Sequence, residues 1–231
     1  MAAATGGMKG FYTLLGGAAV IGAAVIGYLT LRKPAVSIPA NPEIKVADTS
    51  GFRGYFLGSD SAPLTVTEYA DYQCPACQQW ATVQFPTIKE RLIASGKVRW
   101  RYRDFPLEMH PHSRIAAHAA ACAGDQGKYW EMNEKIYSWE GDWPSKSNPI
   151  GVFNDDAKAV GLDLVQYQAC MESGKYAGRM RASYLEGISV GVNSTPTFLI
   201  GNRLYPGGGG VHYDMLKAML DSLAGAKPAA K

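Results

Sequence analysis

The chain carries little net charge and few cysteines. Its formal charge is +3, and three of its positive residues, Lys9, Arg32 and Lys33, flank a single apolar stretch. The remainder is neutral overall and has no electrostatic attraction for phosphate, so we expect no nucleic-acid partner. Four cysteines in 231 residues are too few for a mini-protein held together by disulfides.

Several common site motifs are also missing. No second close cysteine pair accompanies the first, as a four-cysteine zinc site usually requires. The glycine run 207–210 is not followed by the Lys-Ser/Thr of a phosphate-binding loop. His110 and His112 have no cysteine close by to complete a metal site. We therefore predict neither a cofactor nor a bound metal.

One long apolar run stands near the beginning of the sequence. Residues 11–31 are 21 residues without a charge. A helix of that length spans roughly 30 Å, the thickness of a bilayer core. A cleaved signal peptide is the alternative, but its apolar region is shorter, and Arg32-Lys33 stands where cleavage would fall. We predict an uncleaved transmembrane anchor over 1–33 and a proline-rich linker over 34–50.

Strand and helix patterns alternate after the linker. Residues 64–70 and 98–103 have strand patterns, and the helix between them begins near Pro75, is kinked at Pro86 and ends at Gly96. The other expected elements are helices over 113–123, 128–139, 155–160, 164–171 and 175–190, strands over 197–200 and 203–205, and a helix over 213–223.

This order predicts an α/β fold with a helical insertion. The strand–helix–strand unit and the last hairpin are each too small to be stable alone, so we expect them to share one sheet. The predicted organisation is a first part of the α/β domain over 51–108, an inserted helical domain over 109–175, a second part over 176–225, and a tail over 226–231.

The sequence Cys74-Pro75-Ala76-Cys77 follows the first of these strands. Two cysteines three apart at a helix start lie on one face and can close a disulfide ring. Cys74 meets the unpaired N–H groups and positive dipole end of the helix, which lower a thiol pKa. Cys77 lies one turn further in. We predict a redox-active dithiol, with a structural disulfide or half of a zinc site as the alternatives.

Two further features accompany this dithiol. Glu68 shares a strand face with the apolar Leu64, Val66 and Ala70, so we expect it to be buried, where it can take a proton from Cys77. A glutamate that reaches solvent at the edge of the sheet is the alternative. Thr195-Pro196 precedes a strand, and a cis bond there would present the backbone to an extended substrate.

Three segments resemble one known family. Val66 to Cys77 resembles the active-site strand and helix of DsbA-like thioredoxin-fold oxidoreductases, Gly191 to Phe198 resembles their cis-proline loop, and Ala119 to Trp130 resembles their inserted helical domain. The resemblance implies a thioredoxin-like fold and an extracytoplasmic site. It also implies functional roles for four residues, namely nucleophile Cys74, resolving Cys77, buried acid Glu68 and cis-proline Pro196.

The chain differs from the family at one position of the dithiol motif, and it contains a second cysteine pair. The enterobacterial oxidase of the family carries Pro-His between its cysteines, where this chain has Pro75-Ala76, and that histidine helps to stabilise the thiolate. Cys122 and Cys170 look like a pair found in the insertion of some family members, which implies a structural disulfide. Two small buried thiols are the alternative.

The preferred functional hypothesis is a dithiol oxidase, a monomer in the inner membrane whose domain faces the periplasm. Its partners would be reduced secreted proteins, a membrane redox protein that recycles the dithiol, and the membrane itself through residues 11–31. A reductase or isomerase of the same fold is the second hypothesis; isomerases usually dimerise through an extra domain, which is not seen here. A metal-binding thiolate module is the third.

Overall fold

The computed structural model describes residues 21–22 and 51–225. Most of the predicted anchor (residues 11–31), the linker over 34–50 and the tail over 226–231 lie outside these residues. Within the part that is described, no helix combines the length and the apolar character needed to cross a bilayer.

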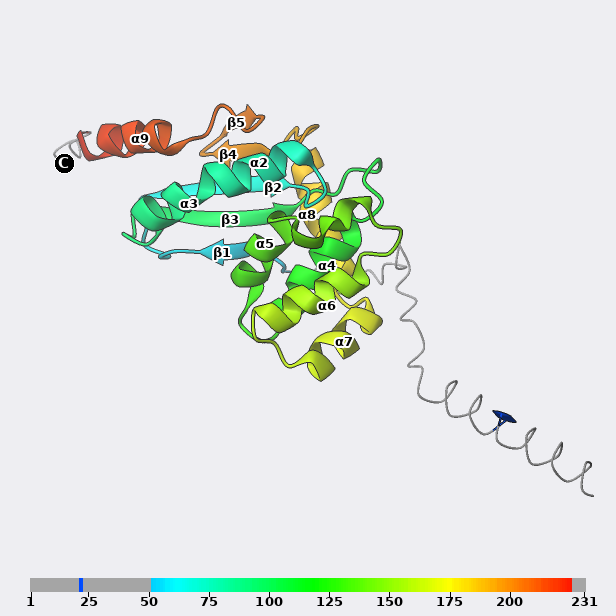
Figure 1. The fold of residues 1–231 in the computed structure, drawn as a ribbon. Helices are drawn as coiled ribbons and strands as arrows, with labels where there is room; N and C mark the ends of the chain where they lie inside the picture. Colours follow the sequence, from blue (N-terminus) through cyan, green and yellow to red (C-terminus); the bar gives the residue numbers. More distant parts are fainter. Residues whose placement is uncertain (1–20, 23–50, 226–231) are drawn as a thin grey trace, which may run out of the picture. The chain divides into compact units, whose positions relative to one another are not determined.

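A mixed sheet of five strands lies at the centre of the described domain (Figure 1). The strand order is β1-β3-β2-β4-β5, in which β2 and β3 are parallel and the other neighbours are antiparallel. The strands are β1 Tyr55–Leu57, β2 Leu64–Ala70, β3 Val98–Asp104, β4 Thr197–Ile200 and β5 Arg203–Pro206. The first strand–helix–strand unit and the last hairpin therefore share one sheet, as predicted.

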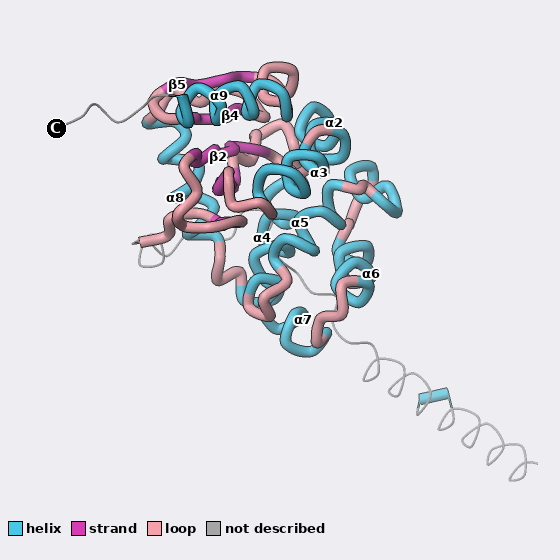
Figure 2. The backbone as a smooth tube through the Cα atoms, turned by 90° about the vertical axis from the view of Figure 1, so that its left-hand side faces the viewer, coloured by secondary structure: helices cyan, strands magenta, loops and turns pink. Residues whose placement is uncertain are grey.

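The helices fall into two groups. Figure 2 shows α4 to α7 gathered together, away from β5 and α9, and they are the helices of the inserted block. The bounds are α2 Pro75–Val83, α3 Phe85–Ile88, a π-helical turn Lys89–Ile93, α4 Ser113–Gly124, α5 Tyr129–Tyr137, a 3-10 segment Glu140–Ser145, α6 Ile150–Ala159, α7 Leu164–Ser173, α8 Ala177–Ser189 and α9 Tyr213–Gly225.

One face of the sheet packs against α2, α3 and α9. Its core residues include Val66 of β2, Trp100 of β3 and Phe198 of β4, all completely buried. Trp80 of α2 stacks on Trp100 with ring centroids 5.3 Å apart, and its indole nitrogen donates to the Val211 carbonyl at 2.7 Å. This aromatic layer fixes the active-site helix on the sheet.

The opposite face packs against α8. Gly187 permits the close approach, because a Cβ there would lie 2.7 Å from the Phe105 ring. The arginines of β3 point to this side, and Arg101 and Arg103 both pair with Glu186 of α8 at 2.7 and 2.6 Å. Both faces of the strand that precedes the dithiol are thus covered.

Three details show the limits of the sequence patterns. The strand β1 was not predicted, since three residues are too few to display a period. Helix α6 begins at Ile150 instead of 155. Pro86 stands at the start of the short helix α3, where a missing N–H costs nothing, so the break falls at Gln84. At α7, Asp163 is the N-cap residue and accepts from two backbone N–H groups.

Candidate active site

Cys74 is the N-cap residue of α2, and Pro75 occupies the first turn. Four residues separate the end of β2 from the start of α2, and Cys74 is the last of them, so the buried strand positions Cys74 at the helix N-terminus. Cys74 and Cys77 are both free thiols and both buried, with 7% and 0% of their surfaces exposed. The small exposed fraction of Cys74 is what a substrate thiol can reach.

The surroundings of Cys74 favour its thiolate. A hydrogen bond from the Cys77 thiol is the largest cause, and together with Thr195 and the N–H groups of Ala76 and Cys77 it lowers the pKa of Cys74 to about 5. As a thiol, Cys74 Sγ lies 3.5 Å from the Thr195 carbonyl oxygen, to which it donates. The Thr195 hydroxyl has no other hydrogen-bond partner in residues 51–225, so it is available to the thiolate.

The surroundings of Cys77 favour the opposite state. Burial raises the pKa of the Cys77 thiol well above its ordinary value, and the neighbouring Cys74 thiolate raises it further. Its Sγ accepts one weak hydrogen bond, from the backbone N–H of Asp71 at 3.5 Å. At neutral pH the pair therefore holds one thiolate and one thiol, which is the arrangement that thiol–disulfide exchange needs.

Glu68 is buried on the sheet face that α2 covers, with 3% of its surface exposed. Its Oε2 accepts from the Trp100 indole nitrogen at 2.9 Å, and Oε1 has no partner among the described residues. Burial raises the pKa of Glu68 to about 8, against a small opposing effect of Trp100. The carboxyl therefore carries a proton at pH 7. The sequence alternative, an edge glutamate in solvent, is wrong.

Tyr137 of α5 is a further buried polar group, and burial raises the pKa of its hydroxyl well above the ordinary value. It shares a 2.7 Å hydrogen bond with Tyr102 of β3. Tyr102 is the neighbour of Glu68 in the pairing of β2 with β3. Buried polar groups therefore continue from Glu68 across β3 to α5.

The Thr195-Pro196 peptide bond is cis. The Pro196 carbonyl accepts from the Gly207 N–H at 2.8 Å, and the Thr197 hydroxyl donates to the Ser194 carbonyl at 2.7 Å. These bonds fix the conformation of the loop, and the contact between the Thr195 carbonyl and Cys74 Sγ places it at the N-terminus of α2. Cys74, Cys77 and Thr195 therefore meet in one site, and Glu68 lies on the strand that leads to it.

Asp71 is a site residue that the sequence reasoning missed. Its buried carboxylate accepts from the backbone N–H groups of Gln73 and Leu107 and from His110 Nδ1, each at 2.8 Å, and from the Ser113 hydroxyl. It thereby joins the active-site loop to the start of α4. An aspartate directly after a buried strand was the available signal, but its partners lie about forty residues away.

The other predicted cysteines lie in the inserted block. Cys122 of α4 and Cys170 of α7 form a disulfide with a Cα–Cα distance of 5.7 Å. The bond ties the two helices together through cysteines that are 48 positions apart in the sequence. All four cysteines belong to one buried cluster of the described residues, in which Cys122 and Cys170 are bonded to each other and Cys74 and Cys77 are free.

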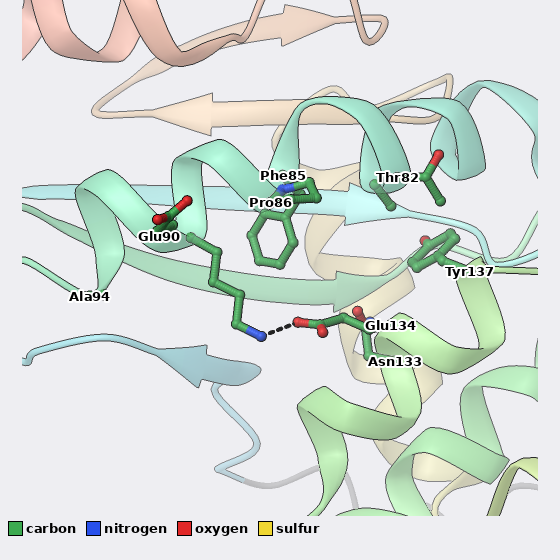
Figure 3. A pocket seen from close by; sticks show the side chains of 10 residues that line it. Thr82, Phe85, Pro86, Glu90, Ala94, Asn133, Glu134 and Tyr137 are labelled. Carbon is green, nitrogen blue, oxygen red and sulfur yellow. Dashed lines mark hydrogen bonds and ion pairs between the residues drawn. The ribbon is translucent and has the colours of Figure 1, made fainter. Parts of the chain in front are cut away.

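A cavity of about 470 Å³ lies between α2–α3 and α5 (Figure 3). Phe85, Pro86 and Tyr137 line it, and the ion pair between Lys89 and Glu134 joins its two sides. A second, smaller groove runs beside the dithiol, lined by Ala76, Trp80, Val83, Gln84 and the glycines 208 and 209 among others. Only the smaller groove includes a residue of the Cys-x-x-Cys motif.

Comparisons with known proteins place this site in a family. The thioredoxin family model matches residues 52–222. A thioredoxin-like oxidoreductase from Silicibacter pomeroyi DSS-3 is 30% identical, covers 75% of this chain and 93% of its own, and superposes with a TM-score of 0.61. The chain belongs to the thioredoxin family, as one of its DsbA-like thiol–disulfide oxidoreductases.

Other similar proteins differ in how much of them is matched. A probable disulfide bond formation protein D of Bacillus anthracis is 26% identical over 71% of this chain and 76% of its own length. Chlamydia trachomatis DsbA shares the fold, with a TM-score of 0.67, 18% identity and coverage of 81% and 100%. A Na⁺/H⁺ antiporter NhaA of Salinispora arenicola is 32% identical over 67% of this chain, which spans only 22% of that protein's length.

Proposed function

We propose that the protein is a dithiol oxidase that introduces disulfide bonds into reduced polypeptides. The observation that carries the proposal is the contrast between a stabilised Cys74 thiolate and a buried, protonated Cys77. A stabilised thiolate favours the reduced form, so the oxidised form gives up its disulfide readily. Relative to an unperturbed thiol, a Cys74 pKa of about 5 raises the potential by up to roughly 60 mV at pH 7, before solvent screening reduces the effect.

The reaction uses the site in two steps. A substrate thiolate attacks Cys74 Sγ of the Cys74–Cys77 disulfide, forming a mixed disulfide and releasing Cys77, which receives a proton. We assign the role of donor to Glu68, the buried acid of the preceding strand, which is protonated at neutral pH. A second substrate thiolate then attacks the substrate sulfur and displaces Cys74 as its stabilised thiolate. Two electrons pass from the substrate to the protein.

The substrate would bind in extended form beside the cis-proline loop. The Thr195 carbonyl is next to Cys74 Sγ, where the backbone of an added strand would run. The smaller groove beside Ala76 is open to apolar side chains, since Val83 in its wall is 61% exposed. The cis-proline loop would pair with the main chain of the substrate, and the shallow groove would accept apolar side chains of different kinds. Together they favour unfolded chains of varied sequence over one folded partner.

The proposed location is the extracytoplasmic side of a membrane, with residues 11–31 as anchor. The Cys122–Cys170 disulfide supports an oxidising compartment. The similarity to stretches of Na⁺/H⁺ antiporters supports a place beside the membrane. A membrane redox protein would then reoxidise the dithiol after each turnover.

A reductase or an isomerase is the competing function, and the reduction potential separates the hypotheses. Equilibration of the dithiol with glutathione buffers is expected to give a value nearer to about −120 mV, typical of an oxidase, than to about −270 mV, typical of a reductase. The oxidised protein should also restore activity to a reduced, unfolded secreted ribonuclease. A potential near −270 mV and no gain of ribonuclease activity would contradict the proposal.

The metal-binding hypothesis for the dithiol has less support. In residues 51–225, no histidine or carboxylate joins Cys74 and Cys77 in a group of three ligands. A group of that size occurs elsewhere, in the inserted helical block.

A further inference from the structure

The disulfide of the inserted block has a histidine beside it. His118 and Cys122 lie one turn apart on α4, and His118 Nε2 is 3.6 Å from Cys122 Sγ. The sulfur of Cys170, on α7, completes a group whose three ligand atoms lie within 4.8 Å of one another. All three residues are buried, with 3%, 0% and 6% of their surfaces exposed.

The observed distance between His118 and Cys122 matches the geometry of a zinc site. Tetrahedral zinc with Zn–S of about 2.3 Å and Zn–N of about 2.05 Å places the two ligand atoms about 3.6 Å apart. The two residues therefore already stand at ligand spacing. Once the disulfide is reduced, only the Cys170 sulfur has to move, until the two sulfurs are about 3.8 Å apart.

The hydrogen bonds of the His118 ring leave Nε2 able to serve as a ligand. In the disulfide form Nε2 donates to the Cys170 carbonyl at 3.1 Å, while Nδ1 is buried and has no partner among the described residues. The ring proton can move to Nδ1 and free Nε2 as a ligand. The carbonyl keeps a second donor, the Ser173 hydroxyl at 2.6 Å.

We propose that reduction of Cys122–Cys170 creates a zinc site held by His118 and the two cysteines. A small-molecule or protein dithiol supplies two electrons and two protons and becomes a disulfide, which leaves two thiols. Zn²⁺ then displaces both thiol protons and binds two thiolates and Nε2. A water molecule takes the fourth position, reached through the exposed edge of Cys170.

The site gives the inserted block a second way to join α4 and α7. Both the disulfide and the zinc ion connect the same two helices, so the metal keeps them together where reductant removes the covalent bond. Two thiolates neutralise the charge of Zn²⁺, and a neutral complex is acceptable in a buried position. The chain would then keep its inserted block folded under oxidising and reducing conditions alike.

Zinc binding by a chain that lacks the catalytic dithiol tests this proposal. The full chain carrying Cys74→Ser and Cys77→Ser, in detergent, is reduced with a phosphine and titrated with Zn²⁺ against a chromogenic chelator. We expect one equivalent bound per chain after reduction and none before. Co²⁺ in place of Zn²⁺ should show a thiolate charge-transfer band. Since Cys74 and Cys77 are absent, the result is independent of the proposed oxidase activity.

Matched variants connect the binding to His118. In the same background, His118→Ala should weaken zinc binding at least about tenfold, whereas His212→Ala, which removes a histidine near α9, should not change it. Circular dichroism of each reduced variant confirms that it is folded, and His118→Gln serves if His118→Ala is not. Absence of zinc binding by the folded, reduced chain, or equal affinity without His118, would overturn the proposal.

Discussion

Replacement of Glu68 by glutamine should make the protein more stable at neutral pH. The native carboxyl has its pKa raised from 4.5 to about 8 by burial, so the folded chain holds a proton that the unfolded chain releases. The free energy of unfolding therefore falls as pH rises from about 4.5 to about 8. Glutamine is neutral at every pH and can still accept from the Trp100 indole.

The size of this effect follows from the pKa values. At pH 7 ionisation of the unfolded side chain favours unfolding by roughly 3 kcal/mol. The free energy of unfolding of the Glu68→Gln variant should therefore exceed that of the native protein by up to this amount at pH 7, and by almost nothing at pH 4.5. Urea unfolding at pH 4.5, 6, 7 and 8 measures it, with the exposed Glu90→Gln as the matched control. An equal gain at all pH values, or a loss at pH 7, would show that the native carboxyl is ionised.

Three other substitutions test separate parts of the structure. Thr195→Val removes a donor to the thiolate, so the pKa of Cys74 should rise above about 5. Thiolate absorbance measures this pKa, and an unchanged titration would show that the Thr195 hydroxyl does not stabilise the thiolate. Joint replacement of Cys122 and Cys170 by alanine should lower the free energy of unfolding by about 4 kcal/mol in urea titrations; no loss would exclude a stabilising cross-link. Gly187→Ala should cost about 1–3 kcal/mol and lower the melting temperature, because its methyl group would overlap an aromatic ring.

The parts of the site that the sequence predicted are those with local signals. The strand before Cys74, the helix after it and the proline before β4 each depend on residues close in sequence. Glu68 was predicted to be buried because a period-two pattern assigns it to an apolar strand face. These signals specify the dithiol and the acid before any long-range contact is known.

The missing parts depend on contacts between distant residues. The carboxylate of Asp71 is satisfied by donors 36 to 42 residues away, beyond the range of any local pattern. Trp100 reaches Glu68 only after β2 and β3 pair. The spacing of His118 and Cys122 places them on one helix face, but only the packing of α7 adds Cys170.

Asp104 is a buried group without an assigned role. It ends β3 with 2% of its surface exposed, and neither carboxyl oxygen has a partner in residues 51–225. Burial raises the pKa of Asp104 to about 7. Its side chain therefore adds to the fall in stability between about pH 4 and pH 7, and part of the pH dependence should remain after Glu68→Gln.

The pH dependence of alkylation in the reduced wild-type protein tests the central claim most directly. Iodoacetamide modification followed by peptide mass spectrometry reports Cys74 and Cys77 separately. We predict that Cys74 reacts with a midpoint near pH 5 while Cys77 stays unmodified in the folded protein. Reaction of Cys74 with a midpoint near pH 9, or equal modification of both cysteines, would contradict the assignment of Cys74 as the nucleophile.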